Sequence, residues 1–237
     1  MRSDKPAGKC PLKSFMPVAG LLVAALALEG CTFAVPIEAT RLPAPLVEPL
    51  PLTVGVYYDA EFRAYEHRQK IRGEVAEHTW TFSLGPPSVA YFDQVFASIF
   101  ERAVPVQNRP SLPARRPEVA AIIEPSIETF HVRSPPHPGI SAFPVPFGTY
   151  SATIGYRITL YSVQGDVIAS WTVGGSGAIQ HTFVSEGLAG IVKGIYSEVI
   201  NAAMREAAGK FILAFRDQPE IRRWLKSIGL ASHSLFD

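Results

Sequence analysis

Apolar residues recur every three or four positions over two stretches of the chain, 88–103 and 195–215, and this spacing predicts amphipathic helices. The repeating positions of the first stretch are Val89, Phe92, Phe96, Ile99, Phe100 and Ala103. Those of the second are Ile195, Val199, Ala203, Ala207, Phe211 and Phe215. Pro105 and Pro219 follow the two stretches and end the helices, because proline lacks a backbone N–H. A shorter apolar pattern predicts a third helix over 221–228.

Strict alternation of apolar and polar residues marks the clearest strand, residues 149–161, TYSATIGYRITLY. One face carries Tyr150, Ala152, Ile154, Tyr156, Ile158 and Leu160, and the other carries Ser151, Thr153, Arg157 and Thr159. A turn over 164–166 returns the chain as a hairpin partner. Further strands are predicted over 52–59, 78–85 and 118–132. The last of these contains Pro125, which cannot donate to a strand ladder and therefore lies either at a sheet edge or at a bulge.

The elements together predict an α+β fold, in which a mostly antiparallel sheet has amphipathic helices packed on one face. Their order is strand, strand, helix, strand, hairpin, long helix and short helix, and the chain shows no internal repeat. The chain has 237 residues, of which 47% are hydrophobic. That is enough for one domain with a full core. We therefore expect a single domain over 52–237.

The first 30 residues follow the plan of a secretory signal peptide. They open with four basic residues, Arg2, Lys5, Lys9 and Lys13. An uncharged apolar stretch follows over 15–28, which is too short for a membrane span of about 20 apolar residues. Loss of this segment removes four of the 22 basic and two of the 21 acidic residues, which leaves 18 against 19 and a net charge of −1. Such a charge gives no indication of a nucleic-acid partner.

The end of the apolar stretch, residues 28–31 with the sequence LEGC, resembles the lipobox of bacterial lipoproteins, although Glu29 departs from the small or apolar residue usual there. The resemblance implies that Cys31 receives a diacylglycerol, that the signal peptide is cleaved before it, and that the new N-terminus is acylated, for example by palmitate. It also implies sorting to the outer membrane, since Thr32 rather than an aspartate follows. The alternative is a buried cysteine at the end of a simple N-terminal anchor. Cys10 leaves with the signal peptide, so no disulfide is expected.

The next segment, 31–51, contains five prolines and keeps neither a helical nor a strand period. We expect an extended tether of about 3.1 Å per residue where it is polyproline-like. Such a tether holds a folded domain off a membrane surface. The sequence therefore divides into a signal peptide (1–30), a tether (31–51) and a domain (52–237).

Candidate catalytic and metal-binding patterns are weak. The histidines form no pair with metal-ligand spacing, and His131 and His137, on either side of a proline-rich loop, are more simply solvated. Residues 174–178, GGSGA, match a nucleophile elbow only in part, because the last glycine is missing, and a strand end that leaves the sheet explains them better. Glu124 and Glu128 are acid–base candidates but are more simply solvated carboxylates. We expect no enzyme activity, no metal and no cofactor.

The proline-rich loop over 133–148, RSPPHPGISAFPVPFG, carries apolar side chains that are costly to expose, while loops usually run over the surface. These side chains either fold back on the core or contact a partner. The candidate partner contacts are Ile140, Phe143, Val145 and Phe147.

The combination of a lipobox, a proline-rich segment and an α+β domain without a catalytic set resembles accessory lipoproteins of the bacterial envelope. The hairpin GYRITLYSVQGDVIASWTVGGSG, ahead of the long helix, looks like that of the ABC-transport auxiliary and curli-secretion lipoproteins in element order, over residues 119–216. The resemblance implies a non-enzymatic structural or assembly partner of an export or transport complex, on the periplasmic face of the outer membrane. Its partners are then the membrane, through the N-terminal lipid, and an envelope protein complex or a homo-oligomer. The alternative is a module that binds a lipid or glycan in a groove between sheet and helix.

Overall fold

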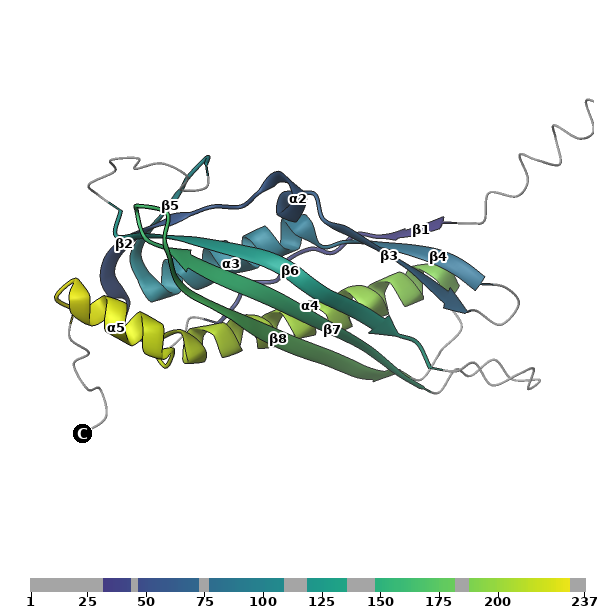
Figure 1. Cartoon of the computed structure of the whole chain (residues 1–237). Coiled ribbons are helices and arrows are strands. Elements are labelled where there is room, and N and C mark those ends of the chain that lie inside the picture. Colours follow the sequence, from purple (N-terminus) through teal and green to yellow (C-terminus); the bar gives the residue numbers. More distant parts are fainter. Residues whose placement is uncertain are drawn as a thin grey trace, which may run out of the picture.

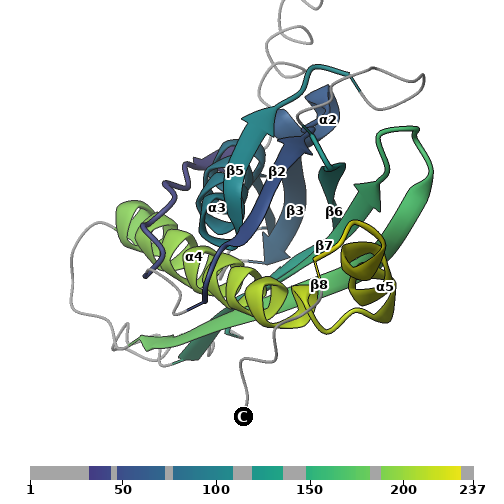
Figure 2. The same ribbon diagram turned by 90° about the vertical axis from the view of Figure 1, so that its left-hand side faces the viewer.

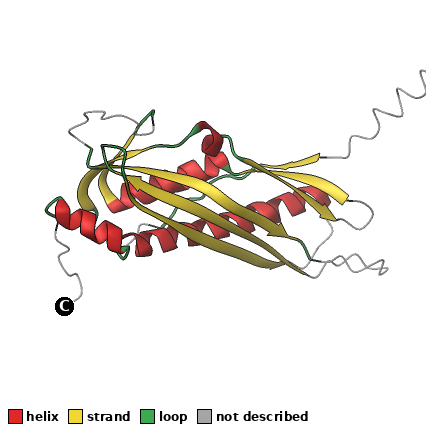
Figure 3. Cartoon of the chain, viewed as in Figure 1, coloured by secondary structure: helices red, strands yellow, loops and turns green. Residues whose placement is uncertain are grey.

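The computed structural model describes residues 32–43, 47–72, 77–108, 119–135, 148–181 and 188–230. Its strands are β1 (Thr32–Val35), β2 (Leu50–Val56), β3 (Glu66–Arg72), β4 (Glu77–Ser83), β5 (Phe100–Pro105), β6 (Ala121–Arg133), β7 (Gly148–Tyr161) and β8 (Val167–His181). Its helices are α2 (Ala60–Arg63), α3 (Gly85–Ile99), α4 (Leu188–Phe215) and α5 (Pro219–Ser227). The α+β class expected from the sequence is confirmed (Figure 3).

The strands form two sheets, one of five strands in the order β5-β2-β6-β7-β8 and one of three in the order β1-β4-β3. The pairs β6–β7, β7–β8 and β3–β4 are antiparallel. The pairs β1–β4, β2–β5 and β2–β6 are parallel. The sheets are therefore mixed rather than purely antiparallel, while the longest ladder, β7–β8, is the antiparallel hairpin that the sequence pattern predicted.

The two long helices, α3 and α4, lie on the same face of the five-stranded sheet, which curves around them (Figures 1 and 2). The apolar row expected over 195–215 is buried throughout, with each of its six members at most 4% exposed. Rings from α3, α4 and β7 meet at the centre of this core, where Phe92 packs edge-on against Tyr156 and Phe211. The hydrophobic effect thus holds the helices to the sheet through aromatic side chains.

The first predicted helix ends earlier than its spacing indicates. Helix α3 stops at Ile99, and Phe100 has the extended backbone of a strand (φ −114°, ψ 145°). Residues 100–105 then form β5 beside β2. The apolar spacing continued to Ala103 because a strand that turns back onto the same core also needs buried side chains. The last helix ends as expected, with Gly229 in the left-handed region (φ 80°) and Leu230 N–H donating to the carbonyl of Leu225.

Of the two explanations considered for Pro125, the structure of β6 supports the unpaired edge, because the strand does not bulge at Pro125. Strand β2 pairs with β6 only over 121–123. At Pro125, β2 therefore offers no carbonyl group that would require an N–H donor from β6. A bulge lies slightly further along, between Ile127 and Thr129. A proline is thus accommodated without a missing ladder bond.

The segment expected to be a tether is corrected by the structure over most of its length. Strand β1 pairs in parallel with β4, and Val35 and Ile37 are 1% and 8% exposed within the core. Beyond β1, Thr40 N–H donates to the Tyr91 hydroxyl, and Leu42 N–H donates to the side chain of Gln94. The segment crosses the helical face as a bound extended strap. After β1 the described segment forms no ladder until β2 begins at Leu50, and side chains of α3 accept from two of its backbone donors instead.

The two sheets are joined by a side chain that imitates a strand ladder. Gln69 of β3 donates from Nε2 to the Val132 carbonyl (2.7 Å) and accepts from Val132 N–H at Oε1 (3.1 Å). Strand β2 ends far short of this point, so the edge of β6 here has no strand partner and the amide of Gln69 occupies the place of one. This double contact positions the three-stranded sheet against β6.

Replacement of Gln69 by glutamate is expected to lower the free energy of unfolding by about 1–3 kcal/mol at neutral pH, because a carboxylate oxygen would then face the Val132 carbonyl oxygen without a proton. The deficit should shrink below the ordinary glutamate pKa of about 4.3, where a protonated carboxyl again donates. Urea unfolding as a function of pH measures both effects. Gln180→Glu, the same change at an exposed position of β8, is the control and should change stability by less than about 0.5 kcal/mol. An equal loss in both variants would contradict the ladder role.

Candidate functional site

The face of β6, β7 and β8 that points away from the helices carries polar side chains in a regular array. The alternation seen in residues 149–161 extends across the register, since Thr153 lies opposite Ser176, Arg157 opposite Thr172, and Thr159 opposite Ser170. We call this surface the outer face. It contains Ser126, Glu128, Thr129, Thr153, Arg157, Thr159, Ser170, Thr172 and Ser176. A solvated sheet face of this kind is expected for an antiparallel sheet that is buried on one side.

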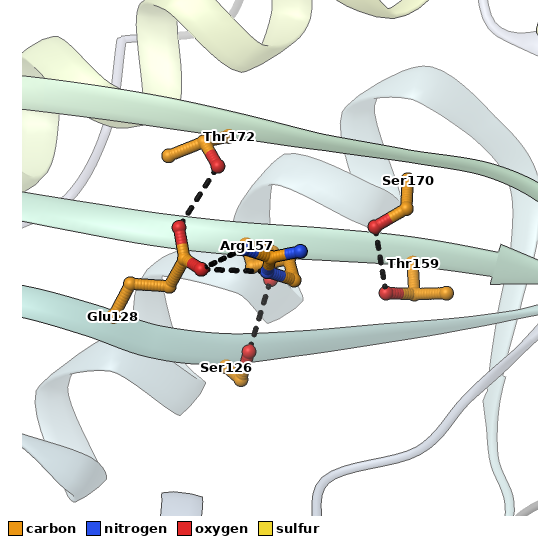
Figure 4. Close-up of polar contacts among 6 residues, drawn as sticks. All are labelled: Ser126, Glu128, Arg157, Thr159, Ser170 and Thr172. Atoms are coloured by element: carbon orange, nitrogen blue, oxygen red, sulfur yellow. Dashed lines mark hydrogen bonds and ion pairs between the residues drawn. The ribbon is translucent and has the colours of Figure 1, made fainter.

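Three side chains from three strands form a charged network on the outer face (Figure 4). Arg157 Nε donates to Glu128 Oε1 (2.6 Å), and its Nη2 also pairs with that oxygen. Thr172 Oγ1 donates to Glu128 Oε2 (2.8 Å). The hydrogen bond from Arg157, then that from Thr172, lowers the pKa of the Glu128 carboxyl, so it is ionised at neutral pH. The bulge in β6 supplies the extra residue that brings Glu128 to this position.

Beside this network lies an open depression of about 820 Å³ with a floor of backbone. Gly155 and Gly174 are opposite each other across β7 and β8, so neither contributes a side chain. A Cβ at Gly155 would overlap the Thr129 hydroxyl, whereas a Cβ at Gly174 would meet only the Ile154 carbonyl at 3.4 Å. Hydroxyls of Thr129, Thr153, Thr172 and Ser176 surround the floor. Lys210 and Leu213 of α4, and Asp217 in the turn after it, border the depression.

The free edge of β8 is capped by a carboxylate from α4. Ser176 donates both its N–H (2.7 Å) and its hydroxyl (2.8 Å) to Glu206 Oε2, while Lys210 pairs with the other oxygen (2.7 Å). The hydrogen bond from Lys210, followed by those from Ser176, lowers the pKa of Glu206 to about 2. A carboxylate so acidic is a poor proton acceptor at neutral pH, so it does not activate Ser176 as a nucleophile.

Residues 174–178 lie inside β8, not at a strand end as expected from the sequence. The stretch pairs with β7 without a shift in register, and none of its glycines has a positive φ. The sharp strand-to-helix turn of a nucleophile elbow is therefore absent from this described stretch. Instead, Gly175 and Gly177 face α4, where a Cβ on either would overlap a helix carbonyl, that of Ala203 or Val199.

The structure separates the acid–base candidates. Glu128 belongs to the network with Arg157, whereas Glu124 is 5% exposed at the β2 end of β6. His131 lies near His67, whose pKa is lowered mainly by burial and in part by the His131 charge. His137 lies outside the described residues. Within the described ranges, no group of three or more possible ligands has the geometry to hold a metal ion.

Cys31 and the loop contacts also fall outside the described residues, so their roles stay predictions. The loop candidates are Ile140, Phe143, Val145 and Phe147. The described chain enters that loop at Pro135 and resumes at Gly148, at the same end of the molecule as the start of β1 (Figure 1).

The sequence pattern predicted the polar half of the outer face but not the network. The alternation over 149–161 placed Thr153, Arg157 and Thr159 on one face. The partner of Arg157 depends on the bulge in β6 and on the register of two hairpins, which no local pattern specifies.

Comparisons with known proteins find a likeness in structure only. No protein-family model matches the chain, and no curated protein matches it. One solved structure that is similar to it belongs to a Helicobacter pylori protein described as a neuraminyllactose-binding hemagglutinin homolog. The two chains share 10% sequence identity with a TM-score of 0.41, over 81% of this chain and 99% of that one. Among the described helices, none is long and apolar enough to cross a membrane.

Proposed function

We propose that this protein is a lipid-anchored component of the bacterial envelope that acts by binding rather than by catalysis. The lipobox at residues 28–31 supports the anchor, and Cys31 is its site. The outer face supports the binding role, because its polar groups are held in fixed positions by the rigid ladders of β6, β7 and β8. The location that goes with this proposal is the outer membrane, with the domain in the periplasm.

The preferred partner is another envelope protein, in an export or transport complex or as a homo-oligomer. The observation that carries this role is the network of Glu128, Arg157 and Thr172, which fixes a charged pair on an exposed sheet face before any partner arrives. Groups that are already ordered lose less entropy on binding. The apolar loop candidates, from Ile140 to Phe147, remain a proposed second contact.

A glycan is the second candidate, because the depression favours it. Its floor of bare backbone at Gly155 and Gly174 admits a ligand close to the sheet, and the surrounding hydroxyls can both donate and accept hydrogen bonds. Sugars offer the same donors and acceptors. A lipid fits less well, because the depression is open and would leave an acyl chain exposed to water.

The mature protein is expected to begin at Cys31 and to carry a diacylglycerol and an amide-linked acyl chain there. Mass spectrometry of the N-terminal peptide from envelope preparations measures this directly. Cys31→Ala should leave an uncleaved precursor, since the modified sulfur is what the lipobox resemblance implies. An unmodified Cys31, or an N-terminus at another residue, would contradict the anchor.

The outer face is expected to capture its partner through Thr153, an exposed residue in the depression. A photo-crosslinking amino acid at Thr153 should give a defined adduct in intact cells. Gly174→Gln should abolish that adduct, because the new side chain fills the depression while its Cβ meets only the Ile154 carbonyl at ordinary contact distance. The melting temperature should not fall, because a glycine inside a strand weakens it.

The controls distinguish a protein partner from a glycan, and both from an outer face that binds neither. The same crosslinker at Val167, 60% exposed beside the opposite hairpin turn, should give no such adduct. Titration with soluble envelope oligosaccharides, with and without Gly174→Gln, tests the glycan. Absence of a Thr153 adduct, together with no oligosaccharide binding, would exclude the outer face as the binding surface.

A further inference from the structure

The folded body begins one residue after the proposed anchor. Thr32 is the first residue of β1, and Thr32 is joined directly to Cys31. Strand β1 is held by its ladder to β4 and by the burial of Val35. A lipid on Cys31 is therefore attached directly to the folded domain. A free tether of 20 residues would instead have allowed the domain to lie about 60 Å from the membrane.

The position of β1 identifies the end of the molecule that faces the lipid. Thr32 lies beside Thr79 near the start of β4, so the hairpin end of β3 and β4 is adjacent to it. Strand β6 ends and β7 begins at the same end, which is on the right in Figure 1. The turn between β7 and β8, and α5, lie at the opposite end (Figure 1).

The same end exposes a row of basic residues. Arg68, Lys70 and Arg72 alternate along the outward side of β3, and all three are exposed. Arg133 is also exposed. It follows Val132, whose backbone is hydrogen-bonded to the side chain of Gln69, a residue in the middle of β3. We call these four residues the basic row: Arg68, Lys70, Arg72 and Arg133. The acidic residues of the hairpin are Glu66, at the far end of the row, Glu77, opposite Arg72 in register, and Glu74, which lies between the two strands and outside the described residues.

We propose that the lipid on Cys31 holds the domain end-on against an anionic membrane surface, with the basic row near the phospholipid headgroups. The inference rests on the proposed lipid anchor. Basic residues near an anionic surface each strengthen binding by roughly five-fold, and a patch of them beside a lipid anchor gives the second attachment that fixes orientation. The outer face and the β7–β8 turn then extend away from the membrane and stay open to a partner.

Depth-dependent quenching tests the orientation in the full lipidated protein. Single fluorescent labels are placed at Thr149→Cys, exposed at the start of β7, and at Val167→Cys, at the far turn. Twelve residues of β7 separate the ends of the molecule by about 40 Å. In phosphatidylglycerol vesicles with a headgroup quencher, the Thr149 label should be quenched several-fold more than the Val167 label. A flexible Gly-Ser insertion between Cys31 and Thr32 should reduce that difference.

Charge variants separate the basic row from the anchor. Arg68→Gln/Lys70→Gln/Arg72→Gln should reduce Thr149 quenching in phosphatidylglycerol vesicles and leave the weaker quenching in phosphatidylcholine vesicles unchanged. Arg222→Gln/Arg223→Gln/Lys226→Gln on α5 removes the same charge from the opposite end and should change neither. The melting temperature of each variant, measured in parallel, confirms that the domain is folded.

The outcomes distinguish this inference from the proposed function. Mass spectrometry of the same samples first establishes whether Cys31 carries lipid, and its absence would overturn both. Lipidated protein with equal quenching of the two labels would overturn the end-on orientation and leave the anchor intact. Equal effects of the two charge variants would show that the basic row does not contact the anionic surface, which also overturns the proposal.

Discussion

Phe211→Ala is expected to lower the free energy of unfolding by about 3–5 kcal/mol. The side chain is fully buried, and its ring stacks on Trp171 (5.7 Å between ring centres). It also packs against Phe96 (5.7 Å) and Phe215 (5.6 Å). Alanine would therefore leave a cavity with rings on several sides that cannot all close it. That loss is a large part of the ~5–15 kcal/mol by which domains are usually stable. Urea unfolding of the purified domain measures it.

Leu213→Ala is the matched control for this prediction. Leu213 lies two residues further along α4, on the side away from the core, and is 72% exposed. Its truncation should change stability by less than about 0.5 kcal/mol, because little apolar area returns to water. A similar loss in both variants would mean that the burial of Phe211 is not what decides the stability of α4, since alanine has the higher helix propensity at both positions. An unchanged Phe211→Ala variant would contradict the burial of that side chain.

Local periodicity was sufficient to find the elements that pack on the sheet. The helix over 195–215 and the strand over 149–161 are each buried on one face only, which leaves a periodic apolar pattern in the sequence. The two elements and their buried faces could therefore be predicted. The limits of α3 could not, because Phe100 continues the apolar spacing while it enters β5. A three-residue apolar spacing does not distinguish a helix from a helix followed by a strand on the same core.

The errors in the N-terminal segment and in β8 have a common cause in long-range contacts. Prolines over 36–51 indicated a free tether, yet the segment is bound through hydrogen bonds from Thr40 and Leu42 to α3, some 50 residues away along the chain. The glycines of β8 indicated the end of a strand. In the structure they lie inside β8, where the close packing of α4 leaves no room for a side chain at Gly175 or Gly177. The network around Arg157 likewise depends on register. Such contacts leave no period in the local sequence.

Gly175→Ala and Gly177→Ala are expected to destabilise the protein strongly, although each adds only one methyl group. The new Cβ at Gly175 would overlap the Ala203 carbonyl oxygen and lie 2.6 Å from Ala207 N. That at Gly177 would overlap the Val199 carbonyl and lie 2.8 Å from the Ala202 methyl. Most of these atoms are backbone, so no rotamer change relieves the overlap and α4 must move away from β8.

The cost of such overpacking is typically about 1–3 kcal/mol, and we expect the upper part of this range because α4 carries Phe211 and Phe215 on the same face. Gly174→Ala is the control, since its Cβ points to the outer face and meets only the Ile154 carbonyl at 3.4 Å. Denaturant unfolding of the three variants should show a large loss at 175 and 177 and none at 174. If alanine were tolerated equally at all three positions, the contact between α4 and β8 would be looser than the structure has it. The glycines would then have to be explained by the backbone of β8 itself.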